Sequence, residues 1–210
     1  RLLQPVLIIG SINRKLPSAM IANSGEYRKK NGQRGCVMMN NFIFENKTKV
    51  YFGKGCVGEY LPEIAATYGD KVLLAYGGGS IKKNGVYEEV IAALEKAGKT
   101  IIEFPGIMEN PTYKKVLEGT KLVKEKQVDW ILAVGGGSVM DCSKAISMAA
   151  VSEKDVWDEY WAKKGVVDFE PMPLGVIVTA SGTGSECNGG AVITNEEVMI
   201  KTDRDYPKCN

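Results

Sequence analysis

Histidine is absent from this 210-residue sequence, and its absence excludes several classes of function. Histidine is the usual general acid or base near neutral pH and the commonest protein ligand of transition metals. The sequence therefore contains no Ser-His-Asp triad, no Cys-His pair and no histidine-based metal site.

Cysteines are few and long apolar runs are missing. The five cysteines stand singly, without a CxxC pair, at Cys36, Cys56, Cys142, Cys187 and Cys209. An odd number of scattered cysteines argues against a disulfide framework or a cysteine zinc site and is typical of a reducing compartment, so we expect a cytoplasmic protein. No apolar run reaches the roughly 18 to 20 residues that a membrane-spanning helix needs, so we expect no membrane partner.

The charges are distributed unevenly along the chain, although the net charge is only +2. Residues 1–38 hold seven of the 27 basic and one of the 25 acidic side chains, which leaves residues 39–210 with a net charge of −4. A mildly acidic segment does not provide the basic surface that binds nucleic-acid phosphates, so we expect no nucleic-acid partner. The basic head could bind RNA or an anionic surface, but its charges lack interleaved aromatic residues.

Residues 1–38 show neither helical nor strand periodicity and contain several glycines and prolines. We interpret them as a flexible or non-native head that is not part of the fold. From Asn41 onward, β-rich apolar runs alternate with stretches of helical pattern. This alternation predicts an α/β fold with a doubly wound, mainly parallel sheet of the Rossmann-like type, in a dinucleotide-binding domain at 39–210.

The expected elements follow from apolar periodicity and from turn residues. We expect strands at 49–52, 71–76, 100–104, 130–134 and 174–179. We expect helices at 58–68 and 86–97, a third helix from an Asn110-Pro111 cap to residue 126, and a fourth after residue 137. Trp157, Tyr160 and Trp161 fall at i, i+3 and i+4; helix-to-core packing is the main interpretation, and lining of a substrate or cofactor approach is the alternative.

Three strand-to-loop junctions are rich in glycine and hydroxyl groups: YGGGS (76–80), VGGGSVMD (134–141) and TASGTGSE (179–186). Such junctions lie at the carboxyl edge of a parallel sheet, where ligands bind. Glycines let backbone N–H groups approach an anion, and a helix N-terminus adds unpaired N–H groups and roughly half a positive charge. Neither GxGxxG nor GxxxxGK[ST] is present. The repeated junctions predict one extended phosphate ligand across the sheet edge.

Individual residues of these junctions have expected roles. Ser138 is expected to be the N-cap of the helix after the second junction, with Asp141 completing a capping box. The two residues could also contact the ligand or serve only as caps. The first junction offers Gly79, Ser80, Lys82 and Lys83 instead of an acid for a ribose 2′-hydroxyl, which favours NADP over NAD unless both lysines are merely solvated.

Four segments together resemble the iron-containing alcohol dehydrogenase family. They are MNNFIFENKTKVYFGKG (39–55), YGGGSIKKNG (76–85), AVGGGSVMDCSK (133–144) and SGTGSE (181–186). The sequence is most similar to the butanol dehydrogenase-like, NAD(P)H-dependent branch, over nearly all of that family's N-terminal domain. The resemblance implies hydride transfer between a nicotinamide and an alcohol or aldehyde, in a homodimer formed through the first strand at 49–52.

The resemblance also implies roles for cofactor-binding residues. It places Gly136, Gly137 and Ser138 at the pyrophosphate and Asp141 beside the same helix start. It places Gly78 and Ser80 at the adenosine ribose, and Thr179, Thr183 and Asn188 along the nicotinamide side. Lys201 would reach the cofactor from a following strand, and the alternative is that it is an exposed strand lysine. In the family, one aspartate and three histidines of a later helical domain bind Fe²⁺ or Zn²⁺. That domain is not included here, so we expect neither catalytic residues nor activity in this chain alone.

Three alternatives remain open. The chain could be a stand-alone, non-enzymatic NAD(P)-binding module. It could also belong to another metal-dependent enzyme of the same superfamily, such as a glycerol dehydrogenase or dehydroquinate synthase, which YGGGSIKKNG resembles less. It could finally be a structural half that assembles with a separate chain.

Overall fold

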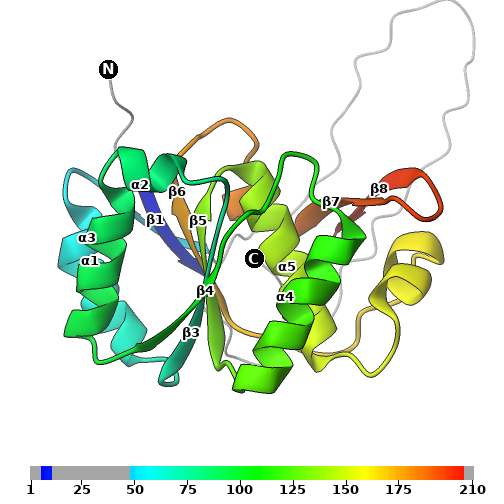
Figure 1. Ribbon diagram of the computed structural model, residues 1–210, viewed down its shortest axis with the longest axis horizontal. Helices are drawn as coiled ribbons and strands as arrows, with labels where there is room; N and C mark the ends of the chain where they lie inside the picture. Colours follow the sequence, from blue (N-terminus) through cyan, green and yellow to red (C-terminus); the bar gives the residue numbers. More distant parts are fainter. Residues whose placement is uncertain (1–5, 11–47, 206–210) are drawn as a thin grey trace, which may run out of the picture.

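A six-stranded sheet, of which four strands are parallel, forms the centre of the molecule (Figure 1). The computed structural model describes residues 6–10 and 48–205. The strand order is β2-β1-β6-β5-β3-β4. The strands are β1 (Val6–Gly10), β2 (Thr48–Phe52), β3 (Lys71–Tyr76), β4 (Thr100–Phe104), β5 (Trp130–Gly135) and β6 (Leu174–Val178). Strands β6, β5, β3 and β4 run parallel, whereas β1 is antiparallel to both of its neighbours.

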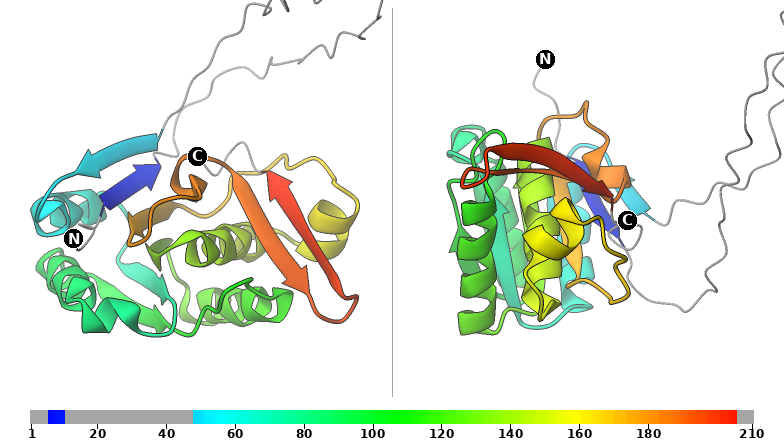
Figure 2. Two further views of the ribbon diagram at one scale, coloured as in Figure 1. Left: turned by 90° about the horizontal axis from the view of Figure 1, so that it is seen from above. Right: turned by 90° about the vertical axis from the view of Figure 1, so that its right-hand side faces the viewer.

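Helices cover both faces of the sheet, as the two perpendicular views in Figure 2 show. Helices α1 (Cys56–Ala66), α2 (Ser80–Lys83) and α3 (Val86–Lys96) lie on one side, and α4 (Tyr113–Lys126) and α5 (Gly137–Val151) lie on the other. The doubly wound α/β fold predicted from the sequence is therefore confirmed. None of the helices in the described residues is long and apolar enough to cross a membrane.

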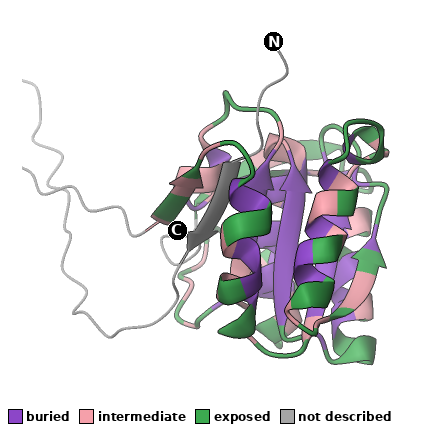
Figure 3. Cartoon of the chain, turned by 90° about the vertical axis from the view of Figure 1, so that its left-hand side faces the viewer, coloured by how far each residue is buried: buried purple, intermediate pink, exposed green. Residues whose placement is uncertain are grey.

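The central strands are buried on both faces, which explains their continuous apolar sequence (Figure 3). In β3, Leu73 and Ala75 pack into the core under α4 and α5. Their neighbours Val72, Leu74 and Tyr76 pack into the core under α1 and α3. Because side chains alternate across a strand, one short apolar run supplies both cores and fixes the sheet between two helical layers.

Strand β1 corrects part of the expectation for residues 1–38. Residues Val6–Gly10 pair with β2 on one side and with β6 on the other, so they belong to the sheet. The run VLIIG is a β-rich apolar segment of ordinary strand length, and the surrounding glycines and prolines concealed it. The rest of that head, residues 1–5 and 11–38, lies outside the described residues.

The start of α4 also differs from the expectation. Its N-cap is Thr112, whose hydroxyl accepts a hydrogen bond from the Lys115 amide, and not Asn110. Asn110 adopts a positive φ of 52°, which asparagine tolerates better than most residues. The expected Asn110-Pro111 cap is therefore wrong: the N-cap lies two residues after Asn110 and is a threonine.

Two further elements, which follow α5 in the chain, lie outside the six-stranded sheet. The first is a π-helix at Trp157–Ala162, in which Trp157, Tyr160 and Trp161 are buried in the core, as the packing interpretation predicted. The second is a two-stranded antiparallel hairpin of β7 (Gly190–Asn195) and β8 (Ile200–Asp205), whose first strand packs on α5. This hairpin extends the third junction away from the sheet edge (Figure 2).

Candidate functional site

The three glycine-rich junctions meet at one edge of the sheet. Strands β3, β5 and β6 are parallel neighbours, with Tyr76 opposite Val134 and Gly135 opposite Val178. The junctions that follow these strands therefore emerge side by side, at the upper edge in Figure 1. The Thr179 amide donates to the Gly135 carbonyl oxygen at 3.0 Å and joins the second junction to the third. The three junctions therefore lie together at one edge of the sheet, as the sequence predicted.

The second junction is packed too closely for side chains at two of its glycines. A Cβ atom on Gly135 would lie 2.6 Å from a methyl group of Val139, and one on Gly137 would lie 2.8 Å from the Thr183 methyl group. A Cβ on Gly136 would have an ordinary 3.5 Å contact with Ala180. Close packing of the chain against itself, and not only access for a ligand, therefore requires glycine at 135 and 137.

Two backbone amides at the start of α5 are available to bind an anion. Gly136 is the N-cap, with an extended backbone and no side-chain cap. The amides of Val139 and Met140 donate to the Gly136 carbonyl, whereas among the described residues no acceptor bonds the amides of Gly137 and Ser138. These free donors lie at the positive end of a 15-residue helix, which is the arrangement that binds phosphate groups.

This geometry overturns the expected capping box. Ser138 lies inside the first turn of α5, so it is not the N-cap. The Asp141 carboxylate instead accepts hydrogen bonds from the Ser185 hydroxyl at 2.7 Å and from the Val192 amide at 3.0 Å. Asp141 therefore connects α5 to the third junction and to β7. The pattern Ser-x-x-Asp was misleading because the N-cap is a glycine, Gly136, which lies two residues before Ser138.

The first junction is open. Gly78 and Ser80 are exposed, and no atom lies within 4 Å of a Cβ placed on Gly78. Gly79 has a φ of 104° and forms the N-cap of α2, which begins at Ser80. Gly77 approaches the Ile107 carbonyl, and the amides of Gly106 and Ile107 donate back to the end of β3. The loop after β4 therefore supports this junction from one side.

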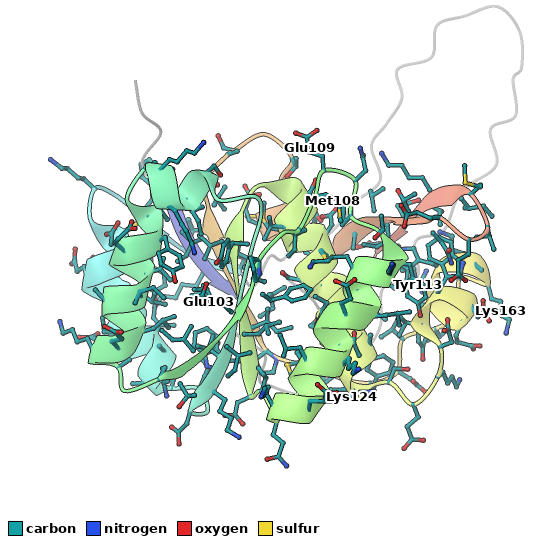
Figure 4. All side chains as sticks on the ribbon, viewed as in Figure 1. Glu103, Met108, Glu109, Tyr113, Lys124 and Lys163 are labelled. Carbon is teal, nitrogen blue, oxygen red and sulfur yellow. The ribbon has the colours of Figure 1, made fainter. Side chains whose placement is uncertain are left out.

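Lys82, one of the two lysines near this junction, has partners of its own. Its Nζ lies 3.8 Å from a Glu103 oxygen and 4.3 Å from the centre of the Tyr87 ring. The Tyr76 and Tyr87 hydroxyls both donate to the same carboxylate, at 2.5 Å and 2.8 Å. Glu103, labelled in Figure 4, thus ties α2 and α3 to strands β3 and β4.

Hydrogen bonds and burial shift the pKa values of this cluster. The hydrogen bonds from Tyr76 and Tyr87 lower the pKa of Glu103. Burial, followed by the hydrogen bond to Glu103, raises the pKa of Tyr76 to about 12. Both phenols therefore remain donors at neutral pH, the carboxylate remains ionised, and the cluster keeps a negative charge opposite Lys82.

The residues at and after the end of the third junction bind a buried lysine of α5 that the sequence interpretation missed. The Lys144 side chain, on α5, is 1% exposed. Its Nζ lies within hydrogen-bonding distance of five oxygens, which belong to Ser185, Asn188 and Gly190. The only signal in the sequence was a lysine in a helix whose buried residues are otherwise small or apolar.

The remaining predicted residues occupy different parts of this edge. Thr183 is exposed, and its side chain lies against Gly137. Its hydroxyl accepts a hydrogen bond from the Ser185 amide. The Asn188 side chain bonds within its own loop, to Gly184 and Gly190 as well as to Lys144. Lys201, on β8, donates to the Asn110 side chain at 2.6 Å. It therefore contacts the loop after β4 and not one of the three junctions.

Comparisons with known proteins agree with this geometry. The family model described as "Iron-containing alcohol dehydrogenase" matches residues 47–209. The chain is 48% identical over 163 residues to the probable NADH-dependent butanol dehydrogenase 1 of Bacillus subtilis (strain 168), a match that covers 78% of this chain and 41% of that protein. It is 40% identical over 162 residues to the NADPH-dependent aldehyde reductase YqhD of Escherichia coli (strain K12), covering 75% of this chain and 40% of the relative.

Solved structures show the same likeness. The crystal structure of NADH-dependent butanol dehydrogenase A from Thermotoga maritima matches with a TM-score of 0.74 and 43% sequence identity, over 81% of this chain and 43% of that chain. The chain thus spans less than half the length of the relatives it matches.

Proposed function

This chain belongs to the iron-containing alcohol dehydrogenase family, as its motifs indicated, and we propose that it is the part of an alcohol or aldehyde oxidoreductase that binds the nicotinamide dinucleotide. The observation that supports this most strongly is the pair of free amides of Gly137 and Ser138 at the positive end of α5. They lie where three glycine-rich junctions meet. In the complete protein, hydride would pass between the nicotinamide and the carbon that bears the alcohol or aldehyde oxygen.

We propose the following placement of the cofactor along the edge. Gly136, Gly137 and Ser138 receive the diphosphate, because their region supplies the free amides. Gly78 and Ser80 flank the adenosine ribose, because β3 is the strand next to β5 and its junction is open. Thr179 and Thr183 lie on the opposite side of the second junction, next to β6, and would face the nicotinamide half.

Three other predicted residues have supporting places in this proposal. Asp141 and Asn188 use their side-chain oxygens for hydrogen bonds within the protein, so they shape the nicotinamide side. Lys201 would have to exchange its bond with Asn110 to reach a cofactor. In this proposal, these residues stabilise the conformation of the site more than they contact the cofactor.

NADP is the cofactor that the first junction favours. In dinucleotide-binding folds, an acid after the strand next to the phosphate loop holds the ribose 2′-hydroxyl. Strand β3 occupies that place and ends in Gly77, Gly78, Gly79 and Ser80, without an acid. Because Lys82 pairs with Glu103, the exposed Lys83 is the more available of the two lysines for a 2′-phosphate. NAD remains the alternative, since relatives of both kinds are similar to this chain.

The described residues do not fit the metal that the family description names. Residues 6–10 and 48–205 contain no group of three or more His, Cys, Asp or Glu side chains that could hold a metal ion. The whole sequence lacks histidine. An Fe²⁺ or Zn²⁺ ion in a complete protein would therefore need ligands from outside the described residues, and we derive no step through it.

The remaining features of the proposal concern partners and location. Small alcohols or aldehydes are the proposed substrates, and nucleic acid is not a proposed partner. Strand β2 lies at one end of the sheet, with Val50 and Phe52 50% and 78% exposed, which supports a homodimer formed through this edge. The cytoplasm is proposed because the five cysteines stand singly along the sequence; Cys36 and Cys209 lie outside the described residues.

Fluorescence titration tests the cofactor proposal. We expect this chain to bind NADPH and NADH saturably, with NADPH the tighter ligand, and we expect ADP to displace both because it carries the adenosine and the diphosphate. Absence of saturable binding of either nucleotide would contradict the proposed function. Binding that ADP does not displace would contradict the assigned diphosphate site.

A further inference from the structure

The most unusual side chain near the edge is that of Lys144, a lysine of α5 that is 1% exposed. Its Nζ lies 2.6 Å, 2.7 Å and 2.8 Å from the carbonyl oxygens of Ser185, Asn188 and Gly190. It also lies 2.9 Å from the Ser185 hydroxyl and 3.3 Å from the Asn188 side-chain oxygen. Three carbonyls from six consecutive residues thus converge on one ammonium group.

Such convergence has an energetic cause. An ammonium group loses several kcal/mol of hydration when it is buried, and hydrogen bonds must compensate for that loss. The five oxygens that compensate for burial of the Lys144 ammonium group come from the segment 185–190, which curves around it. Asp141, one turn earlier on α5, adds the bond from Ser185, so the helix holds the segment at two points.

The segment held in this way continues directly from the part of the third junction that faces the diphosphate site. Thr183 lies against Gly137, and its hydroxyl accepts the Ser185 amide at 3.2 Å. A shift of Ser185 would therefore move Thr183 relative to the free amides. The carbonyl groups that accept hydrogen bonds from Lys144 belong to residues 185–190, and the adenosine half is proposed to lie at the first junction, 76–80.

We propose that Lys144 is a positioning residue for the nicotinamide half of the cofactor: its ammonium group fixes residues 183–190 against the start of α5. This inference rests on the proposed function. Lys144 touches neither substrate nor cofactor in this account. It acts through the carbonyl groups of Ser185, Asn188 and Gly190, and it leaves the adenosine half of the site unaffected.

The test compares two ligands in the variant Lys144→Met. NADPH extends over both halves of the site, whereas ADP carries only the adenosine and the diphosphate. We expect the dissociation constant for NADPH to rise at least about tenfold, because misplaced positioning groups cost about that much or more, and the constant for ADP to change less than about twofold. The exposed Lys121, on α4, supplies the matched control Lys121→Met, which should change neither constant.

A second variant keeps the test valid if Lys144→Met fails to fold, which circular dichroism would reveal. Ser185→Ala removes one contact with Lys144 and one with Asp141, and we expect it to weaken NADPH binding about threefold with ADP binding unchanged. An equal loss of NADPH and ADP affinity, or no loss of either, would overturn the role of Lys144. Failure of the unmodified chain to bind both ligands would instead overturn the proposed function.

Discussion

Replacing Gly136 with aspartate is expected to reduce NADPH and NADH affinity at least about 100-fold, while the protein remains as stable as before. Gly136 is the N-cap of α5, in an extended conformation with φ −96° and ψ −167°. A side chain there meets only an ordinary contact with Ala180, at 3.5 Å. Aspartate is moreover a favoured N-cap residue, because its carboxylate accepts amides of the first turn.

The same carboxylate would oppose a bound diphosphate. It would occupy the Ser138 or Val139 amide and place a negative charge where the phosphate groups are proposed to lie. Hydrogen bonds to charged groups contribute about 1.5 to 3 kcal/mol each, and 1.4 kcal/mol corresponds to tenfold in affinity, so the loss of one such bond together with charge repulsion gives the expected effect.

Thermal unfolding and fluorescence titration of the same samples measure the two consequences separately. Gly136→Asn is the matched control, since it has a similar shape and capping ability without the charge, and it should weaken binding much less. Gly58→Ala is a control for replacing a glycine outside the proposed site and should leave NADPH affinity unchanged. A Cβ at Gly58 would have only a 3.7 Å contact with Glu89. Unchanged NADPH affinity in Gly136→Asp would show that the diphosphate binds elsewhere.

Replacing Gly78 with aspartate is expected to reverse the preference between the two cofactors. Gly78 is exposed, and no atom lies within 4 Å of a Cβ placed on it, so the substitution should fold normally. The new carboxylate would accept hydrogen bonds from the ribose hydroxyls of NADH and repel the 2′-phosphate of NADPH. Like charges in contact cost several kcal/mol, so we expect NADPH affinity to fall at least about 30-fold relative to NADH.

The ratio of the two dissociation constants is the quantity to measure, because it cancels any general loss of folded protein. Gly78→Asn separates charge from size and should change that ratio only slightly. Gly79 is unsuitable for the same test, since its φ of 104° disfavours any side chain. A ratio that stays constant in Gly78→Asp would place the adenosine ribose away from the first junction.

The sequence was sufficient to predict the strands and helices that have strong periodicity. Strands β3 and β4 have the predicted bounds. Strand β3 is a buried apolar run that ends at Gly77, whereas β4 is a partly exposed strand at the end of the sheet that ends before Pro105. Strand β1 was missed because its neighbours 11–38 show no repeating unit, and pairing with β2 and β6 is a long-range property. A five-residue apolar run alone does not reveal such partners.

The chemistry of the site was less predictable than its location. The motifs correctly brought the three junctions to one edge, but the short pattern from Ser138 to Asp141 could not show which residue starts α5. The roles of Lys144 and Lys82 depend on oxygens that lie more than 20 residues away in sequence, those of Ser185 and Glu103. Local pattern therefore indicates where a ligand binds, whereas contacts between distant segments determine which side chains remain available to it.

Backbone amide chemical shifts test the central claim most directly, because they report on the proposed donors themselves. In ¹⁵N-labelled protein titrated with NADPH, we expect the largest shifts at the amides of Gly137 and Ser138, with further shifts at residues 78–80 and 183–185. ADP should reproduce the shifts at Gly137 and Ser138 without those at 183–185. Saturable binding that leaves the Gly137 and Ser138 amides unshifted would contradict the account.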